Sequence, residues 1–290
     1  MHADLSPQAP TNIHTLKELR QAALDALRCP DIDDKLQQTT ALLQSATAQA
    51  LDPVATIAAP STNALPGRPD QPKLIPPADV PHRSPFTPMG RAALIHAICH
   101  IEFNAINLAL DAIWRFPAMP RQFYLDWLRV AAEEAYHFGL LRDHLRTLPH
   151  PEPGQRWDYG DFDAHDGLWD MCEKTANDVT ARMALVPRTL EARGLDATPI
   201  IQAKLRKVNT PDALKACDLL DIILRDEVGH VAIGNHWYRY LCELKNLDPA
   251  GHYVRLAKQY EAPRLRPPFN EEARRKAGFS QIELDYLLGA

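Results

Sequence analysis

Apolar residues recur at helical spacing through the central part of the chain. This period predicts four long helices, over residues 90–116, 121–148, 167–194 and 210–246, with the third continuing as a further helical piece to about residue 209. Prolines separate them, as in PAMP at 117–120, because proline lacks the N–H that a helix interior requires. Thr210 is placed to cap the fourth helix, with Pro211 at its first position. With no alternating strand pattern and no repeat, the chain is predicted to have an all-α body consistent with a four-helix bundle.

The pattern changes on both sides of this body. Residues 12–50 predict two helices, the first capped by Thr11 or Asn12 and ended by Pro30. Residues 53–88 are rich in proline, which predicts an extended strap over the protein, with a disordered linker as the alternative. The apolar side chains in this stretch favour the docked strap: Leu74, Ile75 and Phe86.

The predicted organisation therefore has four parts. These are an N-terminal helical extension (1–52), a proline-rich strap (53–88), the helical bundle (89–246) and a C-terminal tail that packs on the bundle (247–290). We expect one short helix in the tail.

Composition narrows the class of protein. The 290 residues are 46% hydrophobic and carry a net charge of −5, with Lys and Arg scattered, which argues against a dominant phosphate-binding face. The five cysteines are odd in number and lie mostly in apolar runs, as buried thiols of a reducing compartment do. The N-terminus has no secretion signal, and no run approaches the ~18 apolar residues of a membrane span. We expect a cytoplasmic protein without a membrane partner.

Three glutamates interrupt the apolar faces of the predicted helices. Residues three, four and seven positions away share a helix face, and for Glu102, Glu134 and Glu227 these neighbours are almost all apolar. Glu133 faces Asp126 and Arg129 instead, so we expect it to be solvated. An unpaired buried carboxylate is costly, and no Lys or Arg shares the three apolar faces.

A histidine lies one turn after two of these glutamates, in the pairs Glu134/His137 and Glu227/His230. This offset brings a carboxylate oxygen and an imidazole nitrogen to the same point beside a helix, and both are ligands for iron, manganese or zinc. One E-x-x-H is usually a chance surface pair. Two copies on apolar faces, with a third buried glutamate, predict a metal site.

The spacing of the helices suggests one more ligand. Glu102 and Glu134 lie about equally far from the turn at 117–120, so they come level in an antiparallel hairpin. The same reflection from Glu227 falls on Glu191. The competing carboxylates on this helix are Glu173 and Asp178, whose faces are more polar, and Pro187 could kink the helix one turn before Glu191.

These residues resemble the ferritin-like di-iron carboxylate proteins. In that family one helix of each pair gives a Glu and its partner gives E-x-x-H. The resemblance implies a ferritin-like four-helix bundle with two metal ions, held by Glu102, Glu134, His137, Glu191, Glu227 and His230. It also implies a hydrogen bond from a ligand histidine to Asp226, which directly precedes Glu227.

More narrowly, several motifs look like a bacterial ferritin-like family of unknown function over roughly residues 75–280. They are HIEFNAINLALDA, AAEEAYHF, LVPRTLEARGLDATP, RDEVGHVAIGN and RPPFN. One position departs from the radical subunits of ribonucleotide reductases, which carry a tyrosine where this chain has Leu141. A tyrosyl-radical role is therefore not expected.

The resemblance favours a di-iron oxidoreductase that activates O2, a hydroxylase or oxidase, acting on a small-molecule or nucleotide substrate. Manganese or zinc is the alternative to iron, and a homodimer is compatible with the sequence. Two other functions stay open: a ferroxidase that handles iron or peroxide, and a scaffold whose metal is structural. The N-terminal extension and the tail argue against a ferritin cage.

Overall fold

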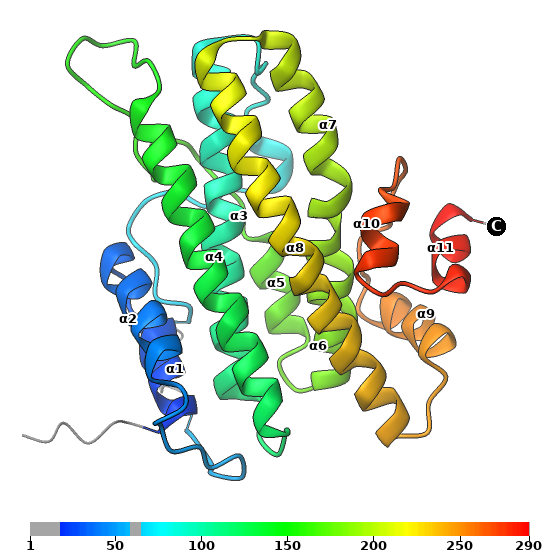
Figure 1. Ribbon diagram of the computed structural model, residues 1–290. Helices are drawn as coiled ribbons and strands as arrows, with labels where there is room; N and C mark the ends of the chain where they lie inside the picture. Colours follow the sequence, from blue (N-terminus) through cyan, green and yellow to red (C-terminus); the bar gives the residue numbers. More distant parts are fainter. Residues whose placement is uncertain (1–17, 59–64, 290) are drawn as a thin grey trace, which may run out of the picture.

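The protein is described here by a computed structural model that covers residues 18–58 and 65–289. Helices dominate it (Figure 1), and across those residues there is no β-strand, only a single parallel bridge between Leu74 and Ala164. The predicted all-α class is confirmed. The cap predicted at Thr11 or Asn12 falls outside the described residues.

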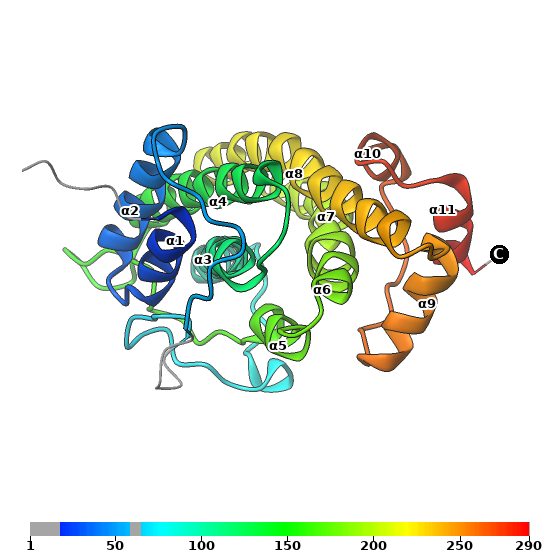
Figure 2. The ribbon, with the colours of Figure 1, turned by 90° about the horizontal axis from the view of Figure 1, so that it is seen from below.

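Two hairpins of helices form the centre of the molecule. Helix α3 (Pro88–Arg115) packs against α4 (Arg121–Thr147), and α7 (Ala192–Val208) packs against α8 (Pro211–Leu244). Helices α4 and α8 also contact each other, which places the two hairpins side by side (Figures 1 and 2). The bounds of α3, α4 and α8 agree with the sequence prediction to within two residues, because proline or threonine marks all of these ends except the C-terminal end of α8.

The predicted helix over residues 167–194 is wrong as a single element. It is divided into α5 (Gly167–Lys174), α6 (Val179–Leu185) and a π-helical turn, η2 (Val186–Glu191), which leads directly into α7. Asp178 starts α6 by accepting hydrogen bonds from the backbone N–H groups of Thr180 and Ala181. Since an Asp side chain that caps a helix satisfies its otherwise unpaired N–H groups, the break at residues 175–178 is stabilised locally.

The N-terminal helices form a layer on one side of the central hairpins. Helix α1 (Leu19–Arg28) packs on α3, and α2 (Ile32–Ser45) packs on α4. Lys35 is fully buried beneath this layer and its ammonium donates to the Leu27 carbonyl (3.0 Å), the Gly67 carbonyl (3.0 Å) and Asn107 Oδ1 (2.5 Å). One side chain therefore joins α1, α2, α3 and the start of the proline-rich segment.

Residues 65–87 of the proline-rich segment are largely extended and contain one 3-10 turn, η1 (Pro77–Asp79). Backbone hydrogen bonds dock it: Gly67 N–H donates to Leu27 O (2.9 Å) and Ile75 N–H donates to Ala164 O (2.8 Å). Of the three side chains expected to dock it, Leu74 is 37% exposed, Phe86 is 57% exposed and Ile75 is half-buried. The segment is also held by the ion pair between Arg68 Nη2 and Asp166 Oδ1 (2.6 Å).

The C-terminal tail has three short helices where the sequence predicted one. They are α9 (Pro249–Gln259), α10 (Glu271–Lys276) and α11 (Gln281–Leu288). They lie on the side of α7 and α8 away from α1 and α2 (Figure 2), with contacts to α6, α7 and α8. The apolar side chains that fasten them to the centre include Ala273, Ala277, Phe279 and Leu284.

Helix α3 is the most apolar part of the body. The sequence predicted no segment apolar enough to span a membrane. By length and composition alone, however, α3 is long and apolar enough to do so, with a mean hydropathy of 1.4 over an 18-residue window. Within the protein, 78% of that window is buried, because α1, α4 and α5 cover it. This is the environment of a core helix.

Candidate metal centre

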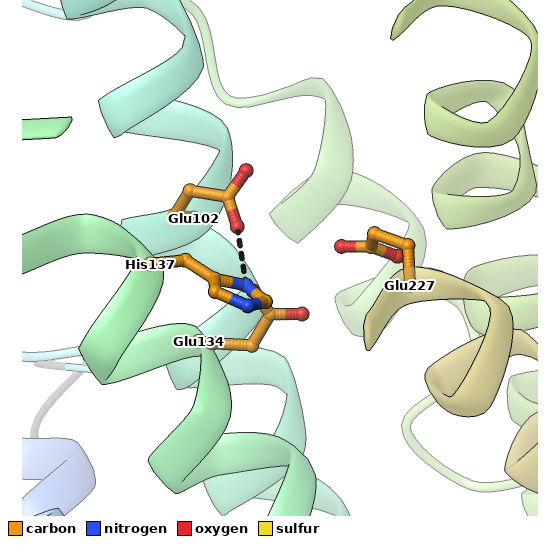
Figure 3. A group of neighbouring side chains, drawn as sticks. All are labelled: Glu102, Glu134, His137 and Glu227. Atoms are coloured by element: carbon orange, nitrogen blue, oxygen red, sulfur yellow. Dashed lines mark hydrogen bonds and ion pairs between the residues drawn. The ribbon is translucent and has the colours of Figure 1, made fainter. Parts of the chain in front are cut away.

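Four side chains from three helices converge between the two hairpins. They are Glu102 of α3, Glu134 and His137 of α4, and Glu227 of α8 (Figure 3). One ligand atom from each lies within 4.8 Å of the other three, and all four side chains are buried. The apolar spacing that singled out these glutamates therefore pointed to one shared place in the core.

Glu134 lies between the two predicted histidines. Its Oε2 is 3.3 Å from His137 Nδ1, and its Oε1 is 2.9 Å from His230 Nδ1. His230 Nδ1 is also 3.8 Å from Glu227 Oε1, while His137 Nδ1 is 3.5 Å from Glu102 Oε2. Both histidines thus direct the same ring nitrogen, Nδ1, toward the glutamates.

Glu191 is the last residue of η2 and is 8% exposed. Neither of its carboxylate oxygens has a hydrogen-bond partner among the described residues. The two competing carboxylates are engaged elsewhere, since Asp178 caps α6 and Glu173 accepts a hydrogen bond from Trp169 Nε1. Burial, and after it the charges of Glu227 and Glu134, raise the pKa of Glu191, so this carboxylate lies within electrostatic reach of the cluster.

The π-helical turn η2, which ends at Glu191, packs closely against Gly234 of α8. A Cβ on Gly234 would lie 2.6 Å from Cβ and Cγ of Pro187, far inside van der Waals contact. Pro187 cannot donate a backbone hydrogen bond, and a π-turn accommodates such an interruption within a helical segment. The Gly234–Pro187 contact therefore fixes where η2, and with it Glu191, lies against α8.

The second ring nitrogen of each histidine contacts a carboxylate from the opposite helix. His137 Nε2 is 3.1 Å from Asp226 Oδ2, and His230 Nε2 is 2.7 Å from Glu133 Oε2. A hydrogen bond at Nε2 fixes the ring orientation and the tautomer that leaves Nδ1 free to bind a metal. Asp226, 18% exposed, has the histidine contact that the resemblance implied.

The sequence prediction that Glu133 is only solvated is incomplete. Although the Glu133 side chain is 38% exposed, it reaches the buried His230. Its neighbours on α4 gave no sign of this contact, because the partner comes from α8. A signal was present nonetheless, since Glu133 precedes Glu134 as Asp226 precedes Glu227.

The electrostatics of the cluster follow from burial and mutual repulsion. Burial, together with the charges of neighbouring glutamates, raises the pKa of Glu102, Glu191 and Glu227. For Glu134 burial acts in the same direction, but His230 and His137 outweigh it and lower its pKa. Burial opposes the charging of His137, yet its contacts with Glu102 and Glu134 raise its pKa to about 11. Protons and a cation therefore compete for the same oxygen and nitrogen atoms of the cluster.

Several buried atoms of the cluster have no hydrogen-bond partner among the described residues, and a bound cation would provide one interaction partner for all of them. Within the described chain, hydrogen-bond partners are lacking for one oxygen each of Glu102, Glu134 and Glu227, both oxygens of Glu191, and Nδ1 of His230. His230 Nδ1 is near Glu134 Oε1 in distance but not in hydrogen-bond geometry. Buried polar atoms are nearly always paired, so this concentration of unpaired acceptors fits a cation. Carboxylate with imidazole is the donor set of iron, manganese and zinc.

The remaining histidines near the centre have other partners. His96 accepts a hydrogen bond from Gly160 N–H (2.9 Å), and His100 is hydrogen-bonded to Tyr159 Oη (2.8 Å). Both rings stack on Tyr159. His96 and His100 thus have partners of their own outside the glutamate cluster.

The structure is thus that of a helical protein with a buried cluster of glutamate and histidine. The chain belongs to the family described as "Protein of unknown function (DUF455)", whose model matches residues 28–285. An "Uncharacterized protein" of Haemophilus influenzae (strain ATCC 51907 / DSM 11121 / KW20 / Rd) is 50% identical over 226 residues, which cover 76% of this chain and 75% of the relative. No solved structure gives a significant match. The resemblance to a bacterial family of unknown function is confirmed.

Proposed function

We propose that this protein is a ferritin-like, dinuclear metal oxidoreductase that activates O2, with iron as its metal. The observation that carries the proposal is the convergence of Glu102, Glu134, His137 and Glu227 in one buried cluster, with His230 Nδ1 2.9 Å from Glu134 Oε1. Glu191 is buried nearby, and neither of its oxygens has a partner among the described residues. A purely structural ion needs fewer donors than these. Manganese and zinc bind the same donor types and are the alternatives to iron.

The arrangement of the ligands on the helices supports the ferritin-like assignment. Each hairpin offers one glutamate from its first helix, Glu102 in α3 and Glu191 before α7. Its second helix offers E-x-x-H, at Glu134/His137 in α4 and at Glu227/His230 in α8. This is the ligand pattern of ferritin-like di-metal carboxylate bundles.

Six residues would hold the two ions: Glu102, Glu134, His137, Glu191, Glu227 and His230. Glu134 would supply negative charge beside both histidines, because its oxygens lie 3.3 Å from His137 Nδ1 and 2.9 Å from His230 Nδ1. Two reduced iron ions bound there would supply the electrons for O2 reduction. Asp226 and Glu133 orient the histidines through Nε2 and hold the proton on that atom.

The surroundings fit oxidation chemistry within a protected site. Apolar neighbours on the ligand faces, such as Ala131, Phe138 and Ile223, are almost completely buried and exclude water. Leu141, also fully buried, offers no phenol for a tyrosyl radical, so the proposed oxidant acts directly on a substrate. We expect that substrate to be a small molecule or a nucleotide.

The proposal is tested by loading the protein with ferrous iron without oxygen and then admitting O2 while recording absorbance. We expect ferric absorption to develop in the wild type and in Glu173→Gln, a carboxylate variant outside the cluster. Glu134→Gln should lose the response, because it removes the charge between both histidines. A wild-type protein whose spectrum is indifferent to O2 would overturn the proposal.

A further inference from the structure

A second site is built where the C-terminal tail meets the central helices. A cavity of about 190 Å³ lies there, beside α9 and α11. Its wall is apolar, made largely by Tyr253, Val254, Leu265, Phe279, Ile282 and Leu287. In Figure 1 these helices are the orange and red elements beside α7 and α8. None of the proposed metal ligands lines this cavity.

Two buried arginines line the otherwise apolar wall. Arg188, 2% exposed, donates from Nε to Asn235 Oδ1 (2.8 Å) and from Nη2 to Glu283. Arg274, fully buried, donates from Nε to Asp196 Oδ1 (3.0 Å) and from Nη2 to Asp196 Oδ2 (2.6 Å). In both cases Nη1 is buried and finds no acceptor within the part of the chain that the structure describes.

Aromatic rings explain how the guanidinium groups are packed but leave these nitrogens short of an acceptor. The Arg188 guanidinium carbon lies 4.6 Å from the Tyr253 ring centroid, and Phe279 is 5.2 Å from Arg188 and 5.1 Å from Arg274. A ring face stabilises the cation, but an anionic oxygen is a much stronger hydrogen-bond acceptor. A buried N–H without one costs roughly 1–3 kcal/mol.

The local charges do not balance. Arg188, Arg239 and Arg274 form ion pairs with only two carboxylates, Glu283 and Asp196. Arg274 is balanced by Asp196, whereas Arg188 and the partly exposed Arg239 share the single carboxylate of Glu283, which leaves one positive charge in excess around Glu283 among the described residues. A single negative charge would compensate it.

We propose that this cavity binds an amphipathic monoanion, a carboxylate with a short apolar tail, whose charge is held by the guanidinium groups of Arg188 and Arg274. The size fits such a ligand, because an apolar cavity of ~150 Å³ holds benzene. A cavity of about 190 Å³ therefore has room for one ring or a short alkyl chain. The apolar walls take the tail, and the arginines take the carboxylate.

The proposal does not depend on the metal centre, and it is tested on the full chain by isothermal titration with octanoate and with octanol. The two probes have the same chain length and differ in charge. We expect octanoate to bind at least ~10-fold more tightly than octanol, as one charge-assisted hydrogen bond implies. Equal binding of both probes, or no binding of octanoate, would overturn the proposal.

A cavity-filling variant locates the site. Val254 lines the cavity at its open side, where it is 41% exposed, so Val254→Trp adds a large side chain over the cavity and leaves both arginines intact. Octanoate binding should fall at least ~10-fold. Leu288→Trp is the matched control, since Leu288 is exposed on α11 and does not line the cavity. Thermal melts verify that both variants are folded. Wild-type affinity in Val254→Trp would place octanoate elsewhere and contradict the assignment.

Discussion

Asp111 and Glu102 are buried acids of the same helix, α3, that are compensated in different ways. Asp111 accepts hydrogen bonds from Arg182 Nη1 (2.5 Å) and Arg115 Nε (2.9 Å), so two cations neutralise it. Among the described residues, Glu102 has no arginine or lysine within ion-pair distance, only His137. The first arrangement is complete as a structural ion pair, whereas the second belongs to the cluster that we propose to bind metal.

Replacing Asp111 with Asn should destabilise the fold. Arg182 is 1% exposed and would remain as an uncompensated buried charge, so we expect the free energy of unfolding to fall by about 3–5 kcal/mol. Chemical denaturation measures this change. Asp143→Asn is the control, because the Asp143 side chain is 80% exposed, and we expect it to stay within about 0.5 kcal/mol of the wild type.

The contribution of Asp111 to the free energy of unfolding should depend on pH in a defined direction. Burial raises the pKa of Asp111, but Arg182 and Arg115 outweigh burial and hold that pKa below its usual value. A carboxylate of this kind contributes its full stability above the unfolded pKa of about 4, and loses it as pH falls through the folded pKa. The difference between wild type and Asp111→Asn should therefore shrink below pH ~4. A constant difference would contradict the ion-pair account.

At this scale the sequence predicted the inner residues of the cluster better than the outer ones. Glu102, Glu134 and Glu227 were found because their own helices surround them with apolar residues. Glu133 was misjudged because its contact with His230 joins two helices. Leu74 and Phe86 are exposed although they are apolar, since backbone hydrogen bonds dock their segment.

At the scale of elements, the π-helical turn η2 is the decisive departure from a regular bundle. It was predictable only as a possible kink at Pro187, because the choice of a π-turn depends on the contact with Gly234 of α8. The break at residues 175–178 was not predicted, since a polar Asp on a helical pattern is equally compatible with a surface position or a cap. Short tail helices were missed for a related reason: their stability comes from packing on α7 and α8.

Replacing Gly234 with Ala should displace η2 and Glu191. The added Cβ would meet Pro187 at 2.6 Å, which forces a shift and costs about 1–3 kcal/mol. We expect binding of the metal nearest Glu191 to weaken, as measured by titration with ferrous or manganous salt.

A second glycine of the same helix is a matched control. A Cβ on Gly229 would meet no atom within 4 Å, and Ala is the better helix former, so Gly229→Ala should keep metal binding and gain up to about 1 kcal/mol. If both variants bind metal alike, the close contact with Pro187 does not position the site.

At the scale of the whole molecule, the chain forms layers around two hairpins. The N-terminal helices cover α3 and α4, and the tail helices cover α7 and α8 (Figure 2). The sequence predicted the all-α class and the long helices, because helical periodicity and proline are local signals. The positions of the outer layers depend on contacts between distant segments, such as Lys35 with Asn107 and Arg274 with Asp196, which a local pattern does not contain.

This arrangement gives the two proposed sites different surroundings. The glutamate and histidine cluster lies between the hairpins, inside both layers. The apolar cavity lies between the centre and the tail, and Arg188 in its wall belongs to the same turn, η2, as Glu191. The two proposed sites therefore share the backbone of η2, but one offers carboxylates and imidazoles and the other offers guanidinium groups and apolar side chains.

The most direct test of the central claim is the metal stoichiometry of the purified protein, measured by elemental analysis after ferrous loading. We predict two ions per chain in the wild type and in Glu173→Gln, and a loss of bound metal in Glu134→Gln, whose oxygens reach both histidines. A protein that retains no metal, or a Glu134→Gln variant that still binds two ions, would contradict the account.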